Sequence, residues 1–418
     1  MTSSGTPSTE QLQDYDIALR EAWEEFCDGL KGQIELVYRP DAPTTELDRA
    51  WGVRYLSRYI NKALNDVLEY LDPEFPQLWV MQHPTSKSFG DNPDCTYLAA
   101  RIDGSKTYRI VGNRGSVNWI RFVLSPYEEI IGGSTLTGGQ VVNFANEDLK
   151  TEWDGSFEVI ISPDPHEGNW IKPPEGMSRL MIRQFFGEWD KERPVTAVLE
   201  RVGWEGQVPA PLTAERMVKA LRDTNNYISK DADRWFQWAQ FYKERTNEFW
   251  QGRPNRPPFG GTEEAERNVG RLLNICFWEI ADDEAFVIEF TPPEVYMWLF
   301  ELNNFWMTSV DYRYHFSSIN SKQATTEANG SVILVISNTD PGVPNWLDPA
   351  GHAQGLIAGR WIGPAPDAPN VKPSGRVVKL ADLEKDLPEN HKRITREGRL
   401  AQLRRLKNGV DNRFGPGR

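Results

Sequence analysis

Cysteines are scarce in this 418-residue chain, and long apolar runs are missing. The three cysteines, Cys27, Cys95 and Cys276, are odd in number and far apart, which argues against a disulfide framework or a zinc site. No uncharged run of about 18 apolar residues occurs, so we expect no membrane span. The first residues, Met1 to Glu10, are polar and lack the segments of a secretory signal, so we expect a disordered start and a cytoplasmic location.

Familiar catalytic motifs are absent as well. The chain has no Gly-x-Ser-x-Gly elbow, no phosphate-binding loop that ends in Lys-Ser/Thr, no dinucleotide fingerprint and no His-Glu-x-x-His pair. We therefore expect no nucleotide cofactor and no metal centre. The hydrolase, kinase, dehydrogenase and metalloprotease classes that carry these motifs lose most of their support.

The net charge of −13 argues against a nucleic-acid partner, because the acidic body would repel a phosphate backbone. The end of the chain differs, since residues 392–418 hold nine Lys and Arg side chains against Glu397 and Asp411. This stretch predicts a solvated basic helix or a tail that lies on the acidic body. A contact for assembly is the alternative.

An internal repeat is the clearest feature that the sequence does contain. Residues 154–170 and 329–346 both run from a Gly-Ser strand pattern to an Asn-Trp pair, and an apolar stretch with one arginine follows each, at Arg183 and Arg360. The offset between matching residues stays between 175 and 177. Because chance similarity rarely keeps such a register, we predict the duplication of one β-rich unit.

The patterning along the chain predicts helices at its start, middle and end, with strands between them. Apolar residues recur at three- and four-residue spacing over 12–30, 56–71 and 217–242, as one helix face requires. Short β-type runs fill the rest, without helices for parallel crossovers. We therefore predict an α+β fold with two duplicated antiparallel β-sandwich, jelly-roll-like domains, and expect the first two helices to pack on the first sandwich. The predicted order is a disordered start (1–10), N-terminal helices (11–75), the first β-sandwich domain (76–206), central helices with a Pro/Gly linker (207–261), the second β-sandwich domain (262–370) and a basic C-terminal helix or tail (371–418).

Two stretches resemble signatures of a bacterial family. They are Gly90 to Tyr97 in the first unit, and Asp340 to His352 followed by Gly359-Arg360-Trp361 in the second. They look like the domain of unknown function 1214 family, which is often found with the related domain 1254. The similarity spans most of residues 79–365, and the second stretch is the more specific. This resemblance implies tandem β-sandwich-like domains with helical additions, and it implies little about a reaction.

One loop of the second copy carries the best candidates for chemistry. Asp348 and His352 lie four residues apart, so Asp348 could orient His352 and His352 could move a proton near neutral pH. The first copy has neither residue. Asn345 and Trp346 are candidates for substrate binding, and the structural alternative is that the Asn-Trp pair closes a turn and plugs the core in both copies.

A second group of candidates precedes this loop. Residues 312–319 predict a strand on which Arg313 and His315 share one face, so His315 is a third catalytic candidate and Arg313 a binding one. Trp306 and Asn304 lie just before it. Aromatic rings beside amides suit a sugar or another amphipathic ligand.

Two further patterns have both a binding and a structural interpretation. Arg360, like its counterpart Arg183, lies in an apolar stretch, where it either forms a buried ion pair or binds an anion. Asp91, Asn92 and Asp94 could help to hold a cation such as calcium. We favour ordinary turn chemistry for these three residues.

These features favour a protein that handles a small molecule or carbohydrate in a cleft of its second β-domain. It could be an enzyme that uses general acid/base chemistry, a hydrolase or lyase without a nucleotide cofactor. The alternatives are a non-catalytic small-molecule or glycan binder, and a structural protein that assembles into homo-oligomers.

Overall fold

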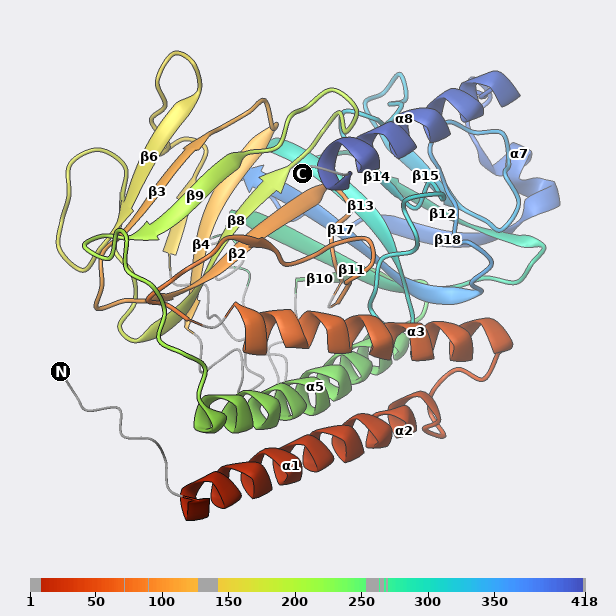
Figure 1. Cartoon of the computed structure of the whole chain (residues 1–418). Helices are drawn as coiled ribbons and strands as arrows, with labels where there is room; N and C mark the ends of the chain where they lie inside the picture. Colours follow the sequence, from red (N-terminus) through yellow and green to blue (C-terminus); the bar gives the residue numbers. More distant parts are fainter. Residues whose placement is uncertain are drawn as a thin grey trace.

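The computed structural model describes residues 9–70, 72–88, 90–126, 142–252, 263, 267 and 270–415. Residues 1–8 of the predicted disordered start, and the Pro/Gly linker predicted at 253–261, lie outside these residues. The strands form sheets in two sets, a layer of helices lies along one side of them, and one further helix runs along the opposite side (Figure 1).

The helices fall into an N-terminal group, one long central helix and a C-terminal group. Thr213 caps the central helix by accepting a hydrogen bond from the Arg216 N–H at 3.2 Å. None of the described helices is long and apolar enough to cross a membrane. Their bounds are α1 Thr9–Gly32, α2 Ile34–Val37, α3 Glu46–Ala63, the π-helix η1 Leu64–Glu69, α5 Ala214–Lys243, the 3₁₀ helix η2 Leu380–Asp382, α7 Leu383–Asp386 and α8 Arg396–Phe414.

The sheets repeat one topology twice, which confirms the duplicated sheet architecture. The first unit has sheets of order β1-β2-β8-β4-β5 and β7-β6-β3-β9, and the second unit has β10-β11-β17-β13-β14 and β16-β15-β12-β18. Neighbouring strands are antiparallel except for the short parallel pairs β6–β7 and β15–β16. The bounds in the first unit are β1 Trp79–Val80, β2 Cys95–Asp103, β3 Tyr108–Asn113, β4 Trp119–Pro126, β5 Val142–Ala145, β6 Ser156–Ile161, β7 Trp170–Ile171, β8 Met177–Phe185 and β9 Thr196–Arg201. Those in the second are β10 Trp250–Gln251, β11 Arg271–Glu279, β12 Glu284–Phe290, β13 Val295–Asn304, β14 Ser318–Asn320, β15 Val332–Ile336, β16 Trp346–Leu347, β17 Gln354–Pro364 and β18 Ser374–Lys379.

In each unit the five-stranded and four-stranded sheets share an apolar core. Ile102 and Ile110 are fully buried in the first unit, and Ile288 and Phe300 are fully buried in the second. This face-to-face packing follows from the alternation of side chains along each strand. The mixed α+β class is as predicted, and the finer jelly-roll-like connectivity stays a prediction.

The helical layer covers mainly the second unit. β11 presents Leu273, Ile275 and Phe277 to the apolar faces of α3 and α5. The first unit instead offers the side chains of Arg101 and Arg179, which bond to Asp66 in the π-helix that continues α3. The prediction that the first two helices pack on the first sandwich is therefore wrong for most of their length. An apolar helix face gains most from an apolar sheet face, and β11 of the second unit presents one to α3 and α5.

The basic helix α8 lies on the body of the protein and joins the two units. Near its start, Arg399 forms an ion pair at 2.9 Å with Asp340 of the second unit. Near its end, Arg413 lies 4.0 Å from the ring centre of Trp189 and donates to the Pro93 carbonyl at 2.5 Å, both in the first unit. Of the two interpretations of this basic stretch, the structure shows the one in which it lies on the body.

Candidate functional site

The Asn-Trp pair makes the same hydrogen bonds in both units. The side-chain amide of Asn345 donates to two backbone carbonyls, at 2.7 and 3.0 Å, and accepts a backbone N–H at 2.8 Å. Asn169 makes the matching three bonds, all at 2.8 Å. Trp346 and Trp170 each donate from Nε1 to the carbonyl of the serine that follows the preceding strand. These bonds match the structural alternative, and substrate binding by Asn345 and Trp346 stays a prediction.

Asp348 pairs with His315, not with His352 as expected. His315 Nδ1 lies 2.7 Å from one carboxylate oxygen of Asp348, and the other oxygen accepts the Ala350 N–H at 2.8 Å. Ala350 has a φ of 54°, a left-handed conformation that is unusual for a residue with a side chain. The carboxylate is thus held from both sides, so it fixes the imidazole ring with Nδ1 toward it.

The His315–Asp348 pair reaches the protein surface. The side chains are 36% and 20% exposed, and no described residue bonds to Nε2 of His315. The hydrogen bond that His315 donates to Asp348 raises the pKa of His315 above its usual value, against a smaller opposing effect of burial. This arrangement suits a ring that carries a proton near neutral pH and can release it through Nε2.

Residues 311–316 form a turn rather than the predicted strand. The Asp311 carbonyl accepts the backbone N–H groups of Tyr314 and His315, both at 3.1 Å, and strand β14 begins only at Ser318. Tyr312 is buried but Tyr314 is exposed, so the expected alternation fails. Asp311 explains the difference, because an Asp side chain that bonds to nearby backbone competes with strand pairing.

His352 lies in the interior, away from His315. Its Nδ1 is 3.3 Å from Asp48 at the start of α3, and its ring centre lies 5.6 Å from that of Trp51. The His352 side chain is fully enclosed, and its Nε2 has no partner among the described residues. A catalytic imidazole must contact its substrate, so the partly exposed His315 is a better catalytic candidate than the enclosed His352.

Arg313 belongs to a group of polar and charged residues beside this pair, which we call the arginine cluster. Arg313 donates hydrogen bonds to the Asp311 carboxylate from Nε at 2.8 Å and from Nη2 at 2.6 Å. Burial opposes the charge on Asp311, but the bonds from Arg313 and the nearby Lys87 hold its pKa well below the usual value. The members of the cluster are Arg54, Arg58, Lys87, Asp91, Ser309, Asp311 and Arg313.

Lys87 is the fully buried cation of this cluster. Its Nζ donates to the Ser309 carbonyl at 3.0 Å and to the Ser309 hydroxyl at 2.8 Å. The hydroxyl donates in turn to Asp91 at 2.7 Å, and the Ser309 N–H donates to the other Asp91 oxygen at 2.8 Å. Burial lowers the pKa of Lys87 to about 8. These bonds fasten the 83–91 segment of the first unit to the second unit.

The remaining candidates in the second unit lie apart from His315. Arg360 forms a buried ion pair with Glu301 on the neighbouring strand, and burial raises the pKa of Glu301 to about 8. Trp306 donates to the Asp48 carbonyl at 2.9 Å, between α3 and the sheet. Asn304 accepts the Trp306 N–H at 3.0 Å. The structure therefore shows the ion-pair alternative for Arg360, and Trp306 and Asn304 form packing and turn contacts.

Of Asp91, Asn92 and Asp94, Asn92 makes the expected turn bond, while the side chains of the two aspartates bond to distant segments. Asn92 accepts the backbone N–H of Asp94 at 2.9 Å, and Asp94 accepts Trp189 Nε1 at 2.7 Å. Burial raises the pKa of Asp94 to about 6. Among the described residues no group of three His, Cys, Asp or Glu side chains could hold a metal ion.

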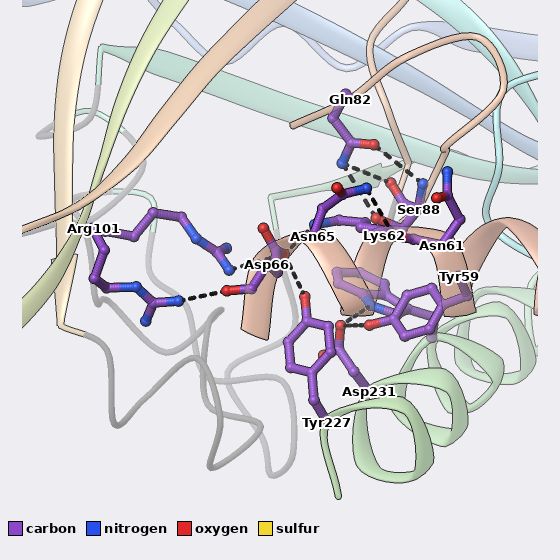
Figure 2. A network of polar contacts seen from close by, with 12 residues as sticks. Tyr59, Asn61, Lys62, Asn65, Asp66, Gln82, Ser88, Arg101, Tyr227 and Asp231 are labelled. Carbon is purple, nitrogen blue, oxygen red and sulfur yellow. Dashed lines mark hydrogen bonds and ion pairs between the residues drawn. The ribbon is translucent and has the colours of Figure 1, made fainter. Parts of the chain in front are cut away.

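A second polar network is fully buried between the helices and the first unit. The carboxylate of Asp66, in the π-helix, accepts hydrogen bonds from Lys62, from Arg179 at 3.1 Å and from Tyr227 at 3.2 Å. Arg101 donates to the backbone carbonyl of Asp66 at 2.8 Å (Figure 2). Burial opposes the charge of Asp66, but Arg179 and Lys62 lower its pKa. Because these residues are enclosed and bonded to one another, the network fastens the helical layer to the first unit.

The described residues also enclose a pocket of about 110 Å³ where both units meet α8. Two buried aromatic residues line it, together with amides and cations, and the Ser318 hydroxyl is buried without a partner. The lining includes Trp189, Phe316, Ser318, Lys322, Gln402 and Arg405.

Sequence reasoning missed Arg54, Arg58 and Lys87. A signal for the first two was present, since Arg54, Arg58 and Lys62 follow one another at four-residue spacing on one face of α3. Like charges at that spacing destabilise an isolated helix, so such a row indicates partners elsewhere. Lys87 lies in an irregular segment and carries no pattern of this kind.

Comparisons with known proteins agree with the expected family. The family described as "Protein of unknown function (DUF1214)" matches residues 99–187, within the first unit rather than at the second stretch that we judged more specific. The solved structure of an uncharacterized protein from Burkholderia cenocepacia is 33% identical, covers 86% of this chain and 97% of its own, and has a TM-score of 0.79. The VPA0106 protein from Vibrio parahaemolyticus is 11% identical over 77% of this chain and 97% of its own, with a TM-score of 0.43. No curated protein matches significantly. From the 33% identity over most of both chains, together with the family match, the chain belongs to the DUF1214 family of proteins of unknown function.

Proposed function

We propose that this protein is an enzyme that transfers a proton to or from a small molecule at His315, with Asp348 as the residue that orients the ring. The observation that carries this proposal is the 2.7 Å bond between His315 Nδ1 and Asp348 at a partly exposed position. Nε2 is left to meet a substrate. The raised pKa of His315 favours the protonated ring as the resting form, so the first step would be general-acid catalysis. A hydrolase or lyase reaction fits this role.

The test is a comparison of substrate consumption by wild type and His315→Gln. Each purified protein is incubated with a bacterial metabolite extract, and mass spectrometry follows which compounds disappear and which form. We expect at least one conversion by wild type that falls by about 10²-fold or more in His315→Gln, with Asp348→Asn intermediate. Equal conversion by wild type and His315→Gln would contradict the proposal.

A non-catalytic binder is the second candidate, and the pocket beside α8 favours it. The rings of Trp189 and Phe316 lie there beside the amides of Gln323 and Gln402, a combination that suits a sugar or a small amphipathic molecule. Calorimetric titration with a monosaccharide panel tests this candidate. Binding that is lost in Gln402→Ala, with no compound consumed from any extract, would favour it over the enzyme.

The proposal keeps three expectations from the sequence: a cytoplasmic location, self-association and jelly-roll-like connectivity. Cell fractionation tests the first, and light scattering at several protein concentrations tests the second. An experimental structure would test the third by tracing the loops that connect the strands.

A further inference from the structure

Arg58 on α3 is a buried cation without a hydrogen-bond acceptor among the described residues, and its guanidinium lies 5.5 Å from the ring centre of Trp51. The residue is 6% exposed, its Nη1 is enclosed, and no described residue accepts a hydrogen bond from its guanidinium. Burial and the neighbouring Arg54 lower the pKa of Arg58 to about 10. A buried charge whose donors lack hydrogen-bond acceptors is costly, so an arginine kept in this state requires an explanation.

The nearby carboxylates are already bonded to other groups. Asp311 accepts both nitrogens of the Arg313 fork, at 2.8 and 2.6 Å, and a longer contact from Arg54 at 3.4 Å. Both oxygens of Asp91 are bonded to Ser309. These carboxylates stabilise the charge of Arg58 through space without accepting hydrogen bonds from it.

The cluster also carries more cations than anions. Its described members include four cations, Arg54, Arg58, Lys87 and Arg313, and two carboxylates, Asp91 and Asp311, and Lys87 donates to Ser309 instead of a carboxylate. Arg54 and Arg313 are partly exposed, at 42% and 24%, so the cluster extends from the surface to Arg58. It lies beside the proposed catalytic pair, because the Asp311 carbonyl accepts the His315 N–H at 3.1 Å.

We propose that Arg58, together with Arg54 and Arg313, binds an oxyanion, and that this anion is a carboxylate or phosphate group of the protein's small-molecule substrate. A guanidinium offers two parallel N–H donors, which match the oxygens of either group. The identification of the anion with the substrate rests on the proposed role of His315. The anion site itself does not depend on that role.

Thermal unfolding and calorimetry with inorganic phosphate or acetate test the site, with sodium chloride at equal ionic strength as the reference. At about a hundredfold excess over Kd we expect phosphate or acetate to raise the Tm of wild type by about 2–5 °C. The Arg58→Gln variant should lose this shift. Without anion, Arg58→Gln should unfold at the wild-type temperature or above it, because the substitution removes a buried charge whose donors lack hydrogen-bond acceptors. The larger of the two shifts identifies the favoured anion.

Three further variants keep the test decisive. Arg222→Gln removes the same charge from the exposed pair with Glu25 and should keep the full shift. If Arg58→Gln does not fold, Arg54→Gln at the exposed edge of the cluster should still weaken binding about tenfold. His315→Gln should bind the anion as wild type does, so a failed catalytic proposal leaves this result intact. The proposal is overturned if neither anion exceeds chloride, or if Arg58→Gln or a folded Arg54→Gln binds as tightly as wild type.

Discussion

The two units share one loop but use it differently. In both, a short parallel strand that begins with Trp leads to a glycine with positive φ, Gly176 at 76° in the first and Gly351 at 85° in the second. The Asn-Trp bonds at the start of the loop are the same. The first loop carries Glu175, whereas the second carries Asp348, whose carboxylate bonds to His315. The shared Asn and Trp residues fix the backbone of the loop, so the residues at the other positions can change without loss of the loop conformation.

The difference also shows that the partner of a residue cannot be inferred from its place in a repeat. Asp348 and His352 belong to the same loop, yet they bond to separate segments, the 311–316 turn and α3. Arg183 and Arg360 hold equivalent places, yet in the second unit Arg360 has Glu301 as an ion-pair partner. The two units therefore share their sheet topology, but equivalent residues in them differ in their side-chain partners.

The largest expected effect tests whether the Asn-Trp frame is equivalent in the two units. Replacing Asn345 by Ala removes three hydrogen bonds to buried backbone and should lower the free energy of unfolding by about 3 kcal/mol. Asn169→Ala should cost a similar amount. Urea unfolding of both variants measures this. A stable Asn345→Ala that loses ligand binding would show that this residue serves the site rather than the frame.

The next effect separates the two histidines of the second unit. His352→Ala leaves a cavity beside Trp51 and should cost about 2 kcal/mol of stability, while turnover persists. His315→Ala should change stability by only about 0.5 kcal/mol, because the side chain is partly exposed, and should abolish turnover. Melting temperatures and substrate consumption are measured on the same samples. The reverse pattern would return the catalytic hypothesis to His352.

A somewhat smaller effect tests the helix that joins the units. A Cβ on Gly409 would lie 2.3 Å from the Cβ of Trp189 and 3.0 Å from its carbonyl carbon. We therefore expect Gly409→Ala to cost about 1–2 kcal/mol through overpacking. Gly32→Ala is the matched control, since nothing lies within 4 Å of a Cβ there. Equal stability of the two variants would mean that α8 contributes little to the union of the units.

The smallest effect is the pH dependence of the His315–Asp348 pair. Because the folded pKa of His315 is raised, the stability from this pair is complete below the unfolded pKa of about 6.5 and is lost as pH rises through the folded pKa. Asp348→Asn should lower the His315 pKa and remove this dependence. NMR titration of the imidazole measures both. An unchanged His315 pKa in Asp348→Asn would contradict the pairing.

Local pattern was enough to predict much of the framework. The described strands lie between the predicted helices, as the short β-type runs indicated. The central helix α5, Ala214–Lys243, includes the whole 217–242 stretch whose apolar spacing predicted a helix. The 312–316 stretch failed, because a single Asp side chain outcompeted the alternation of its neighbours. The candidate site was predicted less well, since His315, Arg313 and Asp348 were named but their pairing was not.

The sequence by itself predicted the mixed fold and the two repeated β-rich units, because periodicity is a local pattern and a repeat is visible when the chain is compared with itself. The family followed from the resemblance of two stretches. Only the tertiary structure decided the partners: His315 lies with Asp348, His352 with Asp48, and Arg58 with the Trp51 ring but no hydrogen-bond acceptor among the described residues. The segment that bonds to His352 lies 304 positions earlier in the chain. Such contacts follow from how helices and sheets pack, and local side-chain patterns do not encode that packing directly.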